Sequence, residues 1–128
     1  MADEVKAADK RTPKQKKGDW GEERAVELLQ GKGYRVVSRK FRSKAGEIDV
    51  IAVRDGVIAF VEVKTRRRLD YGMPCESVDA AKQRRLRLTA EYFLMVNKWT
   101  KGMQPRMDVI ELLCLDGGNY IRHLESAF

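Results

Sequence analysis

Two apolar segments joined by Asp55-Gly56 constrain the fold of this 128-residue chain more than any other feature. Residues 46–53 (GEIDVIAV) and 57–64 (VIAFVEVK) are rich in β-branched and aromatic side chains, which favour β-strands. Asp-Gly is a strong signal for a two-residue turn between antiparallel strands, because such turns need positive φ angles. The chain is therefore predicted to contain a β-hairpin with its turn at Asp55-Gly56.

The remaining patterns predict two helices and three further strands. A helix at 20–30 is expected to begin at a capping box formed by Asp19 and Glu22 and to end at Gly31 and Gly33. The other expected elements are a strand at 34–41, a helix at 77–98, a loop at 99–105, and strands at 107–115 and 120–124. This order, αβββαββ, predicts an α/β fold: a single domain with a mixed central β-sheet flanked by helices. The domain is expected to span 18–128, after a disordered basic arm at 1–17.

The charge balance indicates an acidic partner. Lys and Arg number 26 against 19 Asp and Glu, which gives a net charge of +7 and a pI near 9.6. Such a surplus is compatible with nucleic acid or with an acidic membrane surface. No run approaches about 18 apolar residues, the N-terminus lacks a secretory signal, and the two cysteines form no metal-binding pattern. We therefore expect a cytoplasmic protein that has no membrane partner.

The register of the hairpin follows from its turn and predicts where the charged side chains lie. If the Asp-Gly dipeptide supplies the two central turn residues, the numbers of facing residues add to 111. Asp49 then lies directly opposite Glu62. Glu47 lies opposite Lys64, on the same face of the hairpin. Facing Cβ atoms are about 4.5–5.5 Å apart, so both carboxylates of the first pair could reach one cation.

Two interpretations of this charged face are open. It could be a solvated sheet surface with cross-strand Glu–Lys pairs, the usual role of charges on a hairpin. It could instead bind a divalent cation, since oxygen ligands suit hard ions such as Mg²⁺ or Mn²⁺. The flanking residues are apolar, so both faces of the strands are expected to be buried, where a charge needs a partner or a function. This favours a cation site, in which the carboxylates keep Lys64 protonated.

The same residues carry a resemblance to a known family. Asp49, followed thirteen positions later by Glu62-Val63-Lys64, resembles the D…(D/E)xK signature of restriction-endonuclease-like nucleases. The strings GEIDVIA at 46–52 and FVEVKTR at 60–66, together with the Gly-Glu pair of the first helix, are more specific. In combination they resemble the YraN-like family of bacterial proteins, which is similar to archaeal Holliday-junction resolvases. The resemblance covers 18–128 and implies a restriction-endonuclease-like fold.

The resemblance implies a catalytic set of one lysine and three carboxylates: Asp49, Glu62, Lys64 and Glu22. Asp49 and Glu62, with the Val63 carbonyl, are the implied ligands of Mg²⁺ or Mn²⁺. Glu22 is implied as a further ligand, and capping of its helix explains this residue equally well. Lys64 is implied to orient the attacking water or to stabilise charge on phosphorus. The implied activity is that of a metal-dependent endonuclease, which hydrolyses phosphodiester bonds of branched or structured DNA.

Further residues are candidates for supporting roles. Glu47 and Gln83 are candidate accessory residues, although an exposed polar position on a helix explains Gln83 as well. Two basic clusters are candidate contacts to nucleic acid, most simply DNA: Arg66, Arg67, Arg68, Lys82, Arg84, Arg85 and Arg87. A solvated helix face is the alternative explanation for such a run. His123 has no acid or nucleophile patterned around it, so we expect it to have a packing or surface role.

Two rival hypotheses accompany the nuclease. The chain could be a non-catalytic nucleic-acid-binding module that retains the nuclease fold, or a protein-interaction domain whose surplus charge is incidental. An intact Asp49, Glu62 and Lys64 set argues against a decayed active site. Resolvase-like relatives act as dimers on two symmetric strands, so the resemblance also implies a homodimer.

Overall fold

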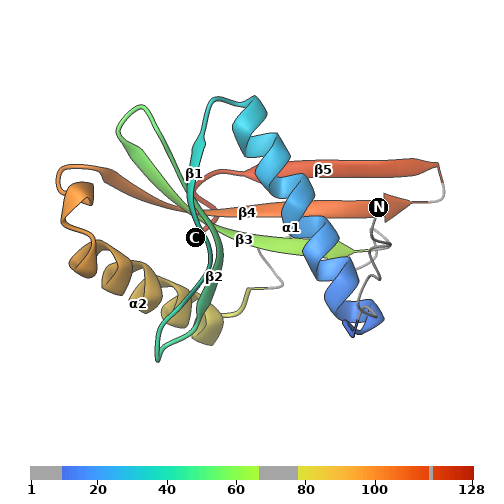
Figure 1. The fold of residues 1–128 in the computed structure, drawn as a ribbon, viewed down its shortest axis with the longest axis horizontal. Helices are drawn as coiled ribbons and strands as arrows, with labels where there is room; N and C mark the ends of the chain where they lie inside the picture. Colours follow the sequence, from blue (N-terminus) through green and yellow to red (C-terminus); the bar gives the residue numbers. More distant parts are fainter. Residues whose placement is uncertain (1–9, 67–77, 116) are drawn as a thin grey trace, which may run out of the picture.

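A computed structural model describes residues 10–66, 78–115 and 117–128 of the chain. In chain order its elements are α1 (Pro13–Gly31), β1 (Arg35–Arg42), β2 (Glu47–Arg54), β3 (Val57–Arg66), α2 (Ala80–Val96), the short 3-10 helix η2 (Lys98–Thr100), β4 (Gln104–Leu115) and β5 (Gly118–Leu124) (Figure 1). The strands form one sheet in the order β1-β2-β3-β4-β5, in which β3 and β4 are parallel and the other neighbours antiparallel. The predicted fold class, with its order αβββαββ and mixed sheet, is confirmed.

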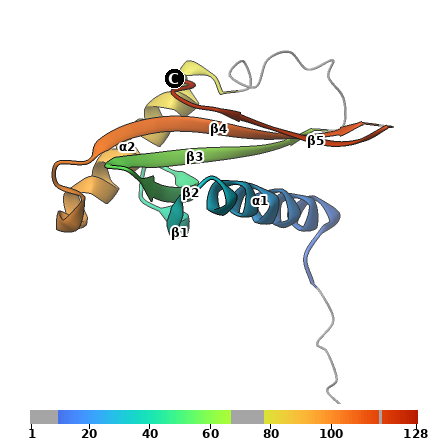
Figure 2. The ribbon, with the colours of Figure 1, turned by 90° about the horizontal axis from the view of Figure 1, so that it is seen from above.

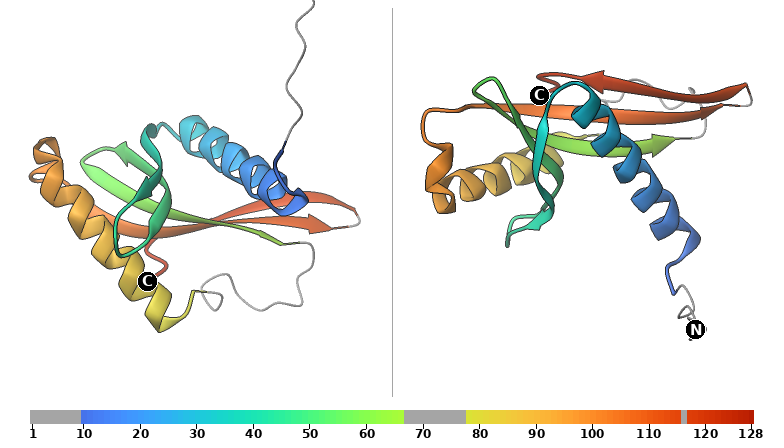
Figure 3. Two further views of the ribbon diagram at one scale, coloured as in Figure 1. Left: turned by 60° about the horizontal axis from the view of Figure 1, so that its bottom comes forward. Right: turned by 45° about the horizontal axis from the view of Figure 1, so that its top comes forward.

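The two long helices pack on opposite faces of this sheet (Figures 2 and 3). On one face Leu29 of α1 packs with Val50 and Val61 of the central hairpin. On the other face Phe93 of α2 packs edge-on against Phe60, with ring centroids 5.9 Å apart. Parallel strands need a crossover connection, and the segment that contains α2 supplies it between β3 and β4. The central strands are therefore buried on both faces, as the apolar sequence predicts.

The predicted hairpin is confirmed, and so is its register from the turn as far as Val50 and Val61. The predicted pairs of Asp49 with Glu62 and of Glu47 with Lys64 lie beyond the last pair of this ladder. Asp55 and Gly56 both adopt positive φ angles, 49° and 78°, as the two-residue turn requires. Facing pairs run from Arg54 and Val57 at the turn to Val50 and Val61, so their numbers add to 111 throughout. The turn chemistry alone therefore fixed which residues of these two strands face each other.

The first helix begins earlier than predicted. Its N-cap is Thr12, whose hydroxyl accepts a hydrogen bond from the Gln15 N–H while the Gln15 side chain accepts from the Thr12 N–H. This is a capping box with Pro13 at the first helical position, so the capping box expected at Asp19 is wrong. Residues 13–17, assigned by the sequence to a disordered arm, are helical, and 1–9 lie outside the described residues. The polar first turns hid the helix because they carry little apolar periodicity.

The other boundaries move by a few residues. Two strands are shifted towards the C-terminus by about one residue, and α2 is shorter than predicted at both ends. The expected loop at 99–105 is partly wrong, because it contains most of η2 and the first two residues of β4. Pro105 is compatible with this strand because it lies at its start, where a missing N–H costs least. Neither long helix in the described ranges is apolar enough over a sufficient length to cross a membrane.

A glycine lets α1 approach β3 closely. A Cβ atom added at Gly21 would lie 2.2 Å from Thr65 Oγ1, whereas one added at Gly18 of the same helix would meet nothing within 4 Å. Gly21 precedes Glu22, so this contact sets the distance between that carboxylate and the sheet. The close crossing is therefore a structural requirement of the candidate site.

We expect Gly21→Ala to lower the free energy of unfolding by about 1–3 kcal/mol, because the new methyl group overpacks the contact with Thr65. Thr65→Ala removes the hydroxyl, and the nearest atoms are then Thr65 Cβ at 3.6 Å and Leu112 Cδ1 at 3.7 Å, ordinary contacts. In that background Gly21→Ala should be neutral, or stabilising by up to about 1 kcal/mol through helix propensity. Urea denaturation of the parent, the two single variants and the double variant measures these free energies of unfolding. Gly18→Ala is the control, and we expect it to raise the free energy of unfolding. Equal destabilisation in both backgrounds would contradict the contact.

Candidate active site

The regular pairing of β2 with β3 ends directly before the two carboxylates of the predicted site. Its last pair is Val50 with Val61. Beyond that pair, Asp49 Oδ2 accepts a hydrogen bond of 2.8 Å from the Val63 backbone N–H. The Asp49 side chain thus serves as the acceptor for an amide of β3, which holds its carboxylate against the strand that carries Glu62.

A cleft of about 410 Å³ lies at Asp49, between α1 and the β1–β2 end of the sheet. Its lining comes from the start of α1 and from three strands: Arg11, Gln15, Gly18, Asp19, Glu22, Lys40, Glu47, Asp49 and Val63. The structure thus brings Glu22 and Glu47 to Asp49. Glu62 and Lys64 are not part of this lining, and Glu62 contacts α2 instead. The four charged hairpin residues therefore gather at one end of the strands but divide between two sides.

The carboxylates next to Asp49 are each neutralised by basic side chains of the strand β1. Glu22 is almost fully buried and accepts a hydrogen bond of 2.9 Å from Arg39 Nε. Glu47 accepts one of 2.5 Å from Arg42 Nε. These pairs reduce the negative charge of the cleft wall.

Asp49 itself is the exception. Among the described residues its hydrogen-bond partner is the Val63 amide, and no lysine or arginine forms an ion pair with it. Burial raises its pKa, and the nearby Glu62 carboxylate raises it further, against the opposing effect of the Val63 N–H, so that the pKa reaches about 7. At neutral pH this carboxylate is therefore poised between its neutral and charged forms, and an added cation would stabilise the charged form.

Glu62 has two basic partners, in contrast to Asp49. Its Oε1 lies 3.0 Å from Lys82 Nζ of α2 and 3.5 Å from Lys64 Nζ. Burial and the neighbouring Lys82 lower the pKa of Lys64, and together they outweigh the effect of Glu62. Glu62 acts on this pKa in the direction that the sequence predicts, whereas the contribution of Lys82 could not be foreseen from the hairpin.

Comparison with known proteins identifies the family. The model of the family described as "Uncharacterised protein family UPF0102" matches residues 21–112. The chain belongs to the UPF0102 family. It is 43% identical over 112 residues to the UPF0102 protein of Persephonella marina, an alignment that covers 88% of this chain and 92% of the relative. It is 46% identical over 115 residues to the UPF0102 protein STH1475 of Symbiobacterium thermophilum, with 87% and 94% covered.

These comparisons confirm the predicted resemblance to YraN-like bacterial proteins. A third UPF0102 protein, from Caldicellulosiruptor saccharolyticus, is 48% identical over 99 residues, which covers 77% of this chain and 83% of the relative. The match to the UPF0102 model spans the carboxylates and both lysines of the candidate site, from Glu22 to Lys82. His123 lies beyond its end.

The basic residues predicted to contact nucleic acid occupy different settings in this UPF0102 chain. Arg66 points inward, with Nε 3.5 Å from Glu111 Oε2 and a side chain only 11% exposed. Arg67 and Arg68 lie outside the described residues. Lys82 lies at Glu62, and Gln83 donates a hydrogen bond to the Val78 carbonyl at the start of α2. The exposed members of the set lie along α2: Arg84, Arg85 and Arg87.

Sequence reasoning missed the basic residues of β1. Lys40 lines the cleft with a positive φ of 53° and donates a 2.9 Å hydrogen bond to Asp19. Arg42 faces Glu47 in the β1–β2 ladder. The signal was available for this second pair, because only four residues separate the two strands and a short antiparallel connection fixes their register. The contact of Lys40 with α1 depends on helix packing and left no sequence signal.

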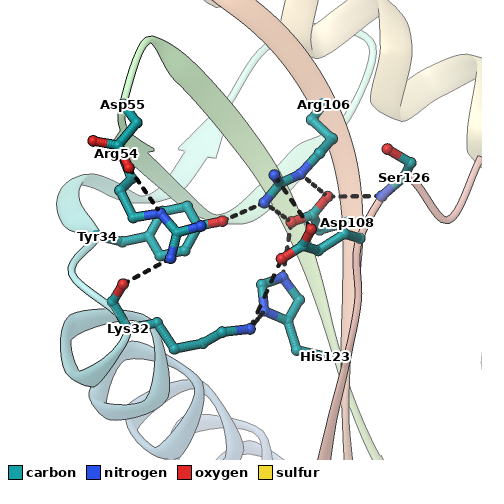
Figure 4. A network of polar contacts seen from close by, with 9 residues as sticks. Lys32, Tyr34, Arg54, Asp55, Arg106, Asp108, His123 and Ser126 are labelled. Carbon is teal, nitrogen blue, oxygen red and sulfur yellow. Dashed lines mark hydrogen bonds and ion pairs between the residues drawn. The ribbon is translucent and has the colours of Figure 1, made fainter.

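A second buried polar cluster lies at the other end of β3 and holds the chain terminus to the sheet (Figure 4). Asp108 is fully buried, accepts two hydrogen bonds of 2.8 Å from Arg106 and a third of 3.1 Å from the Ser126 N–H. His123 Nε2 lies 2.8 Å from Asp108 Oδ2, and His123 Nδ1 lies 2.7 Å from Lys32 Nζ. The predicted packing role of His123 fits this setting. Arg106 and Asp108 thus form a salt bridge on β4, which lies inside the sheet between β3 and β5.

Proposed function

We propose that this UPF0102 protein is a metal-dependent endonuclease that hydrolyses phosphodiester bonds of branched or structured DNA. The observation that carries the proposal is the state of Asp49, a buried carboxylate that lies beside Glu62 and has a pKa near 7. Among the described residues no lysine or arginine forms an ion pair with Asp49, whereas each neighbouring carboxylate has a basic partner. A divalent cation between Asp49 and Glu62 would supply the missing positive charge. Such a cation would also remove the repulsion that now keeps Asp49 partly protonated.

The donor atoms fit a hard cation. Asp49 Oδ2 is engaged by the Val63 amide, so Oδ1 is the oxygen available to a metal. Within the described ranges, no three His, Cys, Asp or Glu side chains form a group that could hold an ion. Mg²⁺ is commonly held by one or two carboxylates and keeps several waters, so Asp49, Glu62 and the Val63 carbonyl suffice. Glu22 is a weaker candidate ligand, because Arg39 already neutralises it.

The proposed chemistry assigns a role to each side chain. Bound Mg²⁺ or Mn²⁺ would act as a Lewis acid towards the phosphodiester and the attacking water. Asp49 and Glu62 would hold the ion, and Glu47, paired with Arg42, lines the same cleft as Asp49. Lys64 stabilises the charge that develops on phosphorus. Its lowered pKa also brings it closer to the range in which an amine can accept a proton from water.

The proposed substrate follows from the exposed basic residues. Arg84, Arg85 and Arg87 project from the helix that also carries Lys82 to Glu62, so they can bind phosphates on the path to the site. Contacts of this kind recognise the backbone and its shape rather than a base sequence. A homodimer would present two such sites to the two strands of a DNA junction.

A non-catalytic nucleic-acid-binding module is the second candidate function. The observation that favours it is the pairing of Glu62 with two lysines, Lys64 and Lys82, since a carboxylate already neutralised in this way does not require a metal. This candidate keeps the basic surface of α2 but assigns no reaction to the carboxylates. It predicts DNA binding that is sensitive to salt and independent of divalent cations.

The test is the incubation of labelled four-way-junction, duplex and single-stranded DNA with the protein in Mg²⁺, Mn²⁺ or EDTA. We expect cleavage of the junction that requires metal and that falls about a hundredfold or more in Lys64→Ala, through loss of charge stabilisation. Salt-sensitive binding without cleavage in any metal would favour the binding module. The absence of salt-sensitive binding to all three DNAs would contradict both candidates.

A further inference from the structure

Lys82 is held in the candidate active site by the first turn of α2. The N-cap residue Asp79 accepts a hydrogen bond of 2.8 Å from the Lys82 backbone N–H, which fixes the start of the helix. From this turn the Lys82 side chain reaches across to β3, where its Nζ lies 3.0 Å from Glu62 Oε1. The side chain of Glu62 is only 8% exposed, so this ammonium neutralises a carboxylate that has little contact with solvent.

The Glu62 carboxylate thus has two ammonium groups close to it, because Lys64 Nζ also lies 3.5 Å from Glu62 Oε1. Asp49 and Glu62 together bring two negative charges, and the two lysines bring two positive charges. A divalent cation that joins these groups leaves an excess of positive charge at close range, which is costly in a partly buried site. The ammonium of Lys82 and a divalent cation therefore compete for the same carboxylate.

Of the two lysines, Lys82 can move away from Glu62 more easily than Lys64 when a cation binds. Its side chain is 31% exposed, and a lysine stem has four flexible carbons that let the charged end move into solvent. Lys64 lies on β3 at a position that pairs with Glu111 of β4, so its backbone position is fixed by this ladder. The exposed arginines of α2 follow Lys82 directly, so a displaced ammonium stays beside the surface that would bind phosphates.

We propose that Lys82 is a positioning residue that acts as a built-in counter-cation of Glu62 and competes with the divalent metal for this carboxylate. It keeps the metal affinity of the DNA-free protein low. The inference rests on the proposed function, since it needs a metal site at Asp49 and Glu62. It assigns to Lys82 a regulatory role at the carboxylates in place of the simple DNA contact that the sequence predicts.

Titration of the full chain with Mn²⁺ alone, followed by the electron paramagnetic resonance signal of the free ion, tests this inference. Lys82→Met keeps the aliphatic stem and removes the charge, and it should bind Mn²⁺ about tenfold more tightly than the parent, the order expected for one charge at this range. Lys82→Gln should behave in the same way, and Lys82→Arg should stay near the parent value. Tighter binding is not a result that a damaged fold produces.

Arg84→Met is the matched control, because it removes one positive charge from the same helix without touching Glu62. It should change the Mn²⁺ affinity less than about twofold, as expected of an exposed, solvent-screened charge. Equal tightening in Arg84→Met and Lys82→Met, or unchanged or weaker binding in Lys82→Met beside a parent that binds Mn²⁺, would overturn the inference and leave the metal site standing. No Mn²⁺ binding by any of the proteins would overturn the metal site and the inference together.

Discussion

Asp49→Asn is expected to abolish metal-dependent cleavage and, at the same time, to make the metal-free protein more stable at neutral pH. Loss of cleavage follows from the loss of a charged ligand, and we expect a fall of about a thousandfold, equivalent to about 4 kcal/mol of activation free energy. The gain in stability follows from the environment of Asp49, where burial and Glu62 disfavour the charged carboxylate. An asparagine keeps an oxygen acceptor for the Val63 N–H and carries no charge.

The pH dependence has a definite sign. The pKa of Asp49 is about 7 in the folded protein against 3.8 for an ordinary aspartic acid side chain, so between these values the folded state binds more protons than the unfolded state. The free energy of unfolding of the parent should therefore fall as pH rises from about 4 to 7 and level off above 7. The loss can reach about 4 kcal/mol. Asp49→Asn lacks this contribution. Its gain in the free energy of unfolding over the parent should therefore be absent near pH 4 and complete near pH 8.

Urea denaturation in EDTA at pH 5 and pH 8 measures this difference, and added Mg²⁺ should restore stability to the parent alone. Glu47→Gln is the matched control, because Glu47 lies on the same strand and in the same cleft but is neutralised by Arg42. It should not gain stability at pH 8. An Asp49→Asn protein that is less stable than the parent at pH 8 would show that Asp49 is a structural hydrogen-bond acceptor and not a strained metal ligand.

Asp108→Asn is expected to destabilise the fold by about 3–5 kcal/mol, because it leaves the largely buried Arg106 guanidinium with only the exposed carboxylate of Glu125, 3.6 Å away, as a counter-charge. Burial alone would raise the pKa of Asp108, but hydrogen bonds from His123, Arg106 and the Ser126 N–H outweigh it and lower the pKa. This stabilisation is therefore present above the unfolded pKa near 3.8 and is lost as pH falls through the lower pKa of the folded state. The difference in free energy of unfolding between the parent and Asp108→Asn should therefore become smaller as the pH falls.

Asp55→Asn provides a closely matched comparison for this second prediction. Asp55 lies in the hairpin turn at the same end of the molecule, is 90% exposed, and forms a long ion pair of 3.7 Å with Arg54. Asparagine tolerates its positive φ, so the substitution should change the free energy of unfolding by less than about 0.5 kcal/mol. Similar urea midpoints for the two variants would show that the buried cluster around Asp108 does not anchor the C-terminal segment.

The hairpin was predictable because its determinants are local. Asp55-Gly56 determined the turn, and the two-residue period of a strand determined which face each side chain lies on. Apolar residues on both faces indicated that the two strands are buried. The start of α1 was missed although Thr12, Pro13 and Gln15 carry a capping signal, because the helix there is polar and its apolar face begins later. The order of the helices and strands follows from the hydrophobic pattern of the sequence. The ends of the helices depend on capping residues, which are polar and leave no mark on that pattern.

The candidate site was only half predictable, for a related reason. The hairpin turn placed Asp49 and Glu62 at the same end of neighbouring strands, although the regular ladder ends at Val50 and Val61. Lys82 reaches Glu62 from a helix twenty residues further along the chain, and its contact depends on how α2 packs on the sheet. Burial and, after it, the proximity of Lys82 lower the pKa of Lys64, against the raising effect of Glu62. Electrostatic expectations from a hairpin alone are therefore incomplete where a helix brings in additional charges.

Anomalous diffraction from crystals of the protein soaked in Mn²⁺ shows directly whether Asp49 and Glu62 bind a divalent cation. We predict a peak between Asp49 and Glu62, within coordination distance of Asp49 Oδ1, and no such peak in crystals of Asp49→Asn. A fully soaked parent crystal without a peak at these carboxylates, or with the ion bound elsewhere, would contradict the assignment of this cleft as a divalent-cation site.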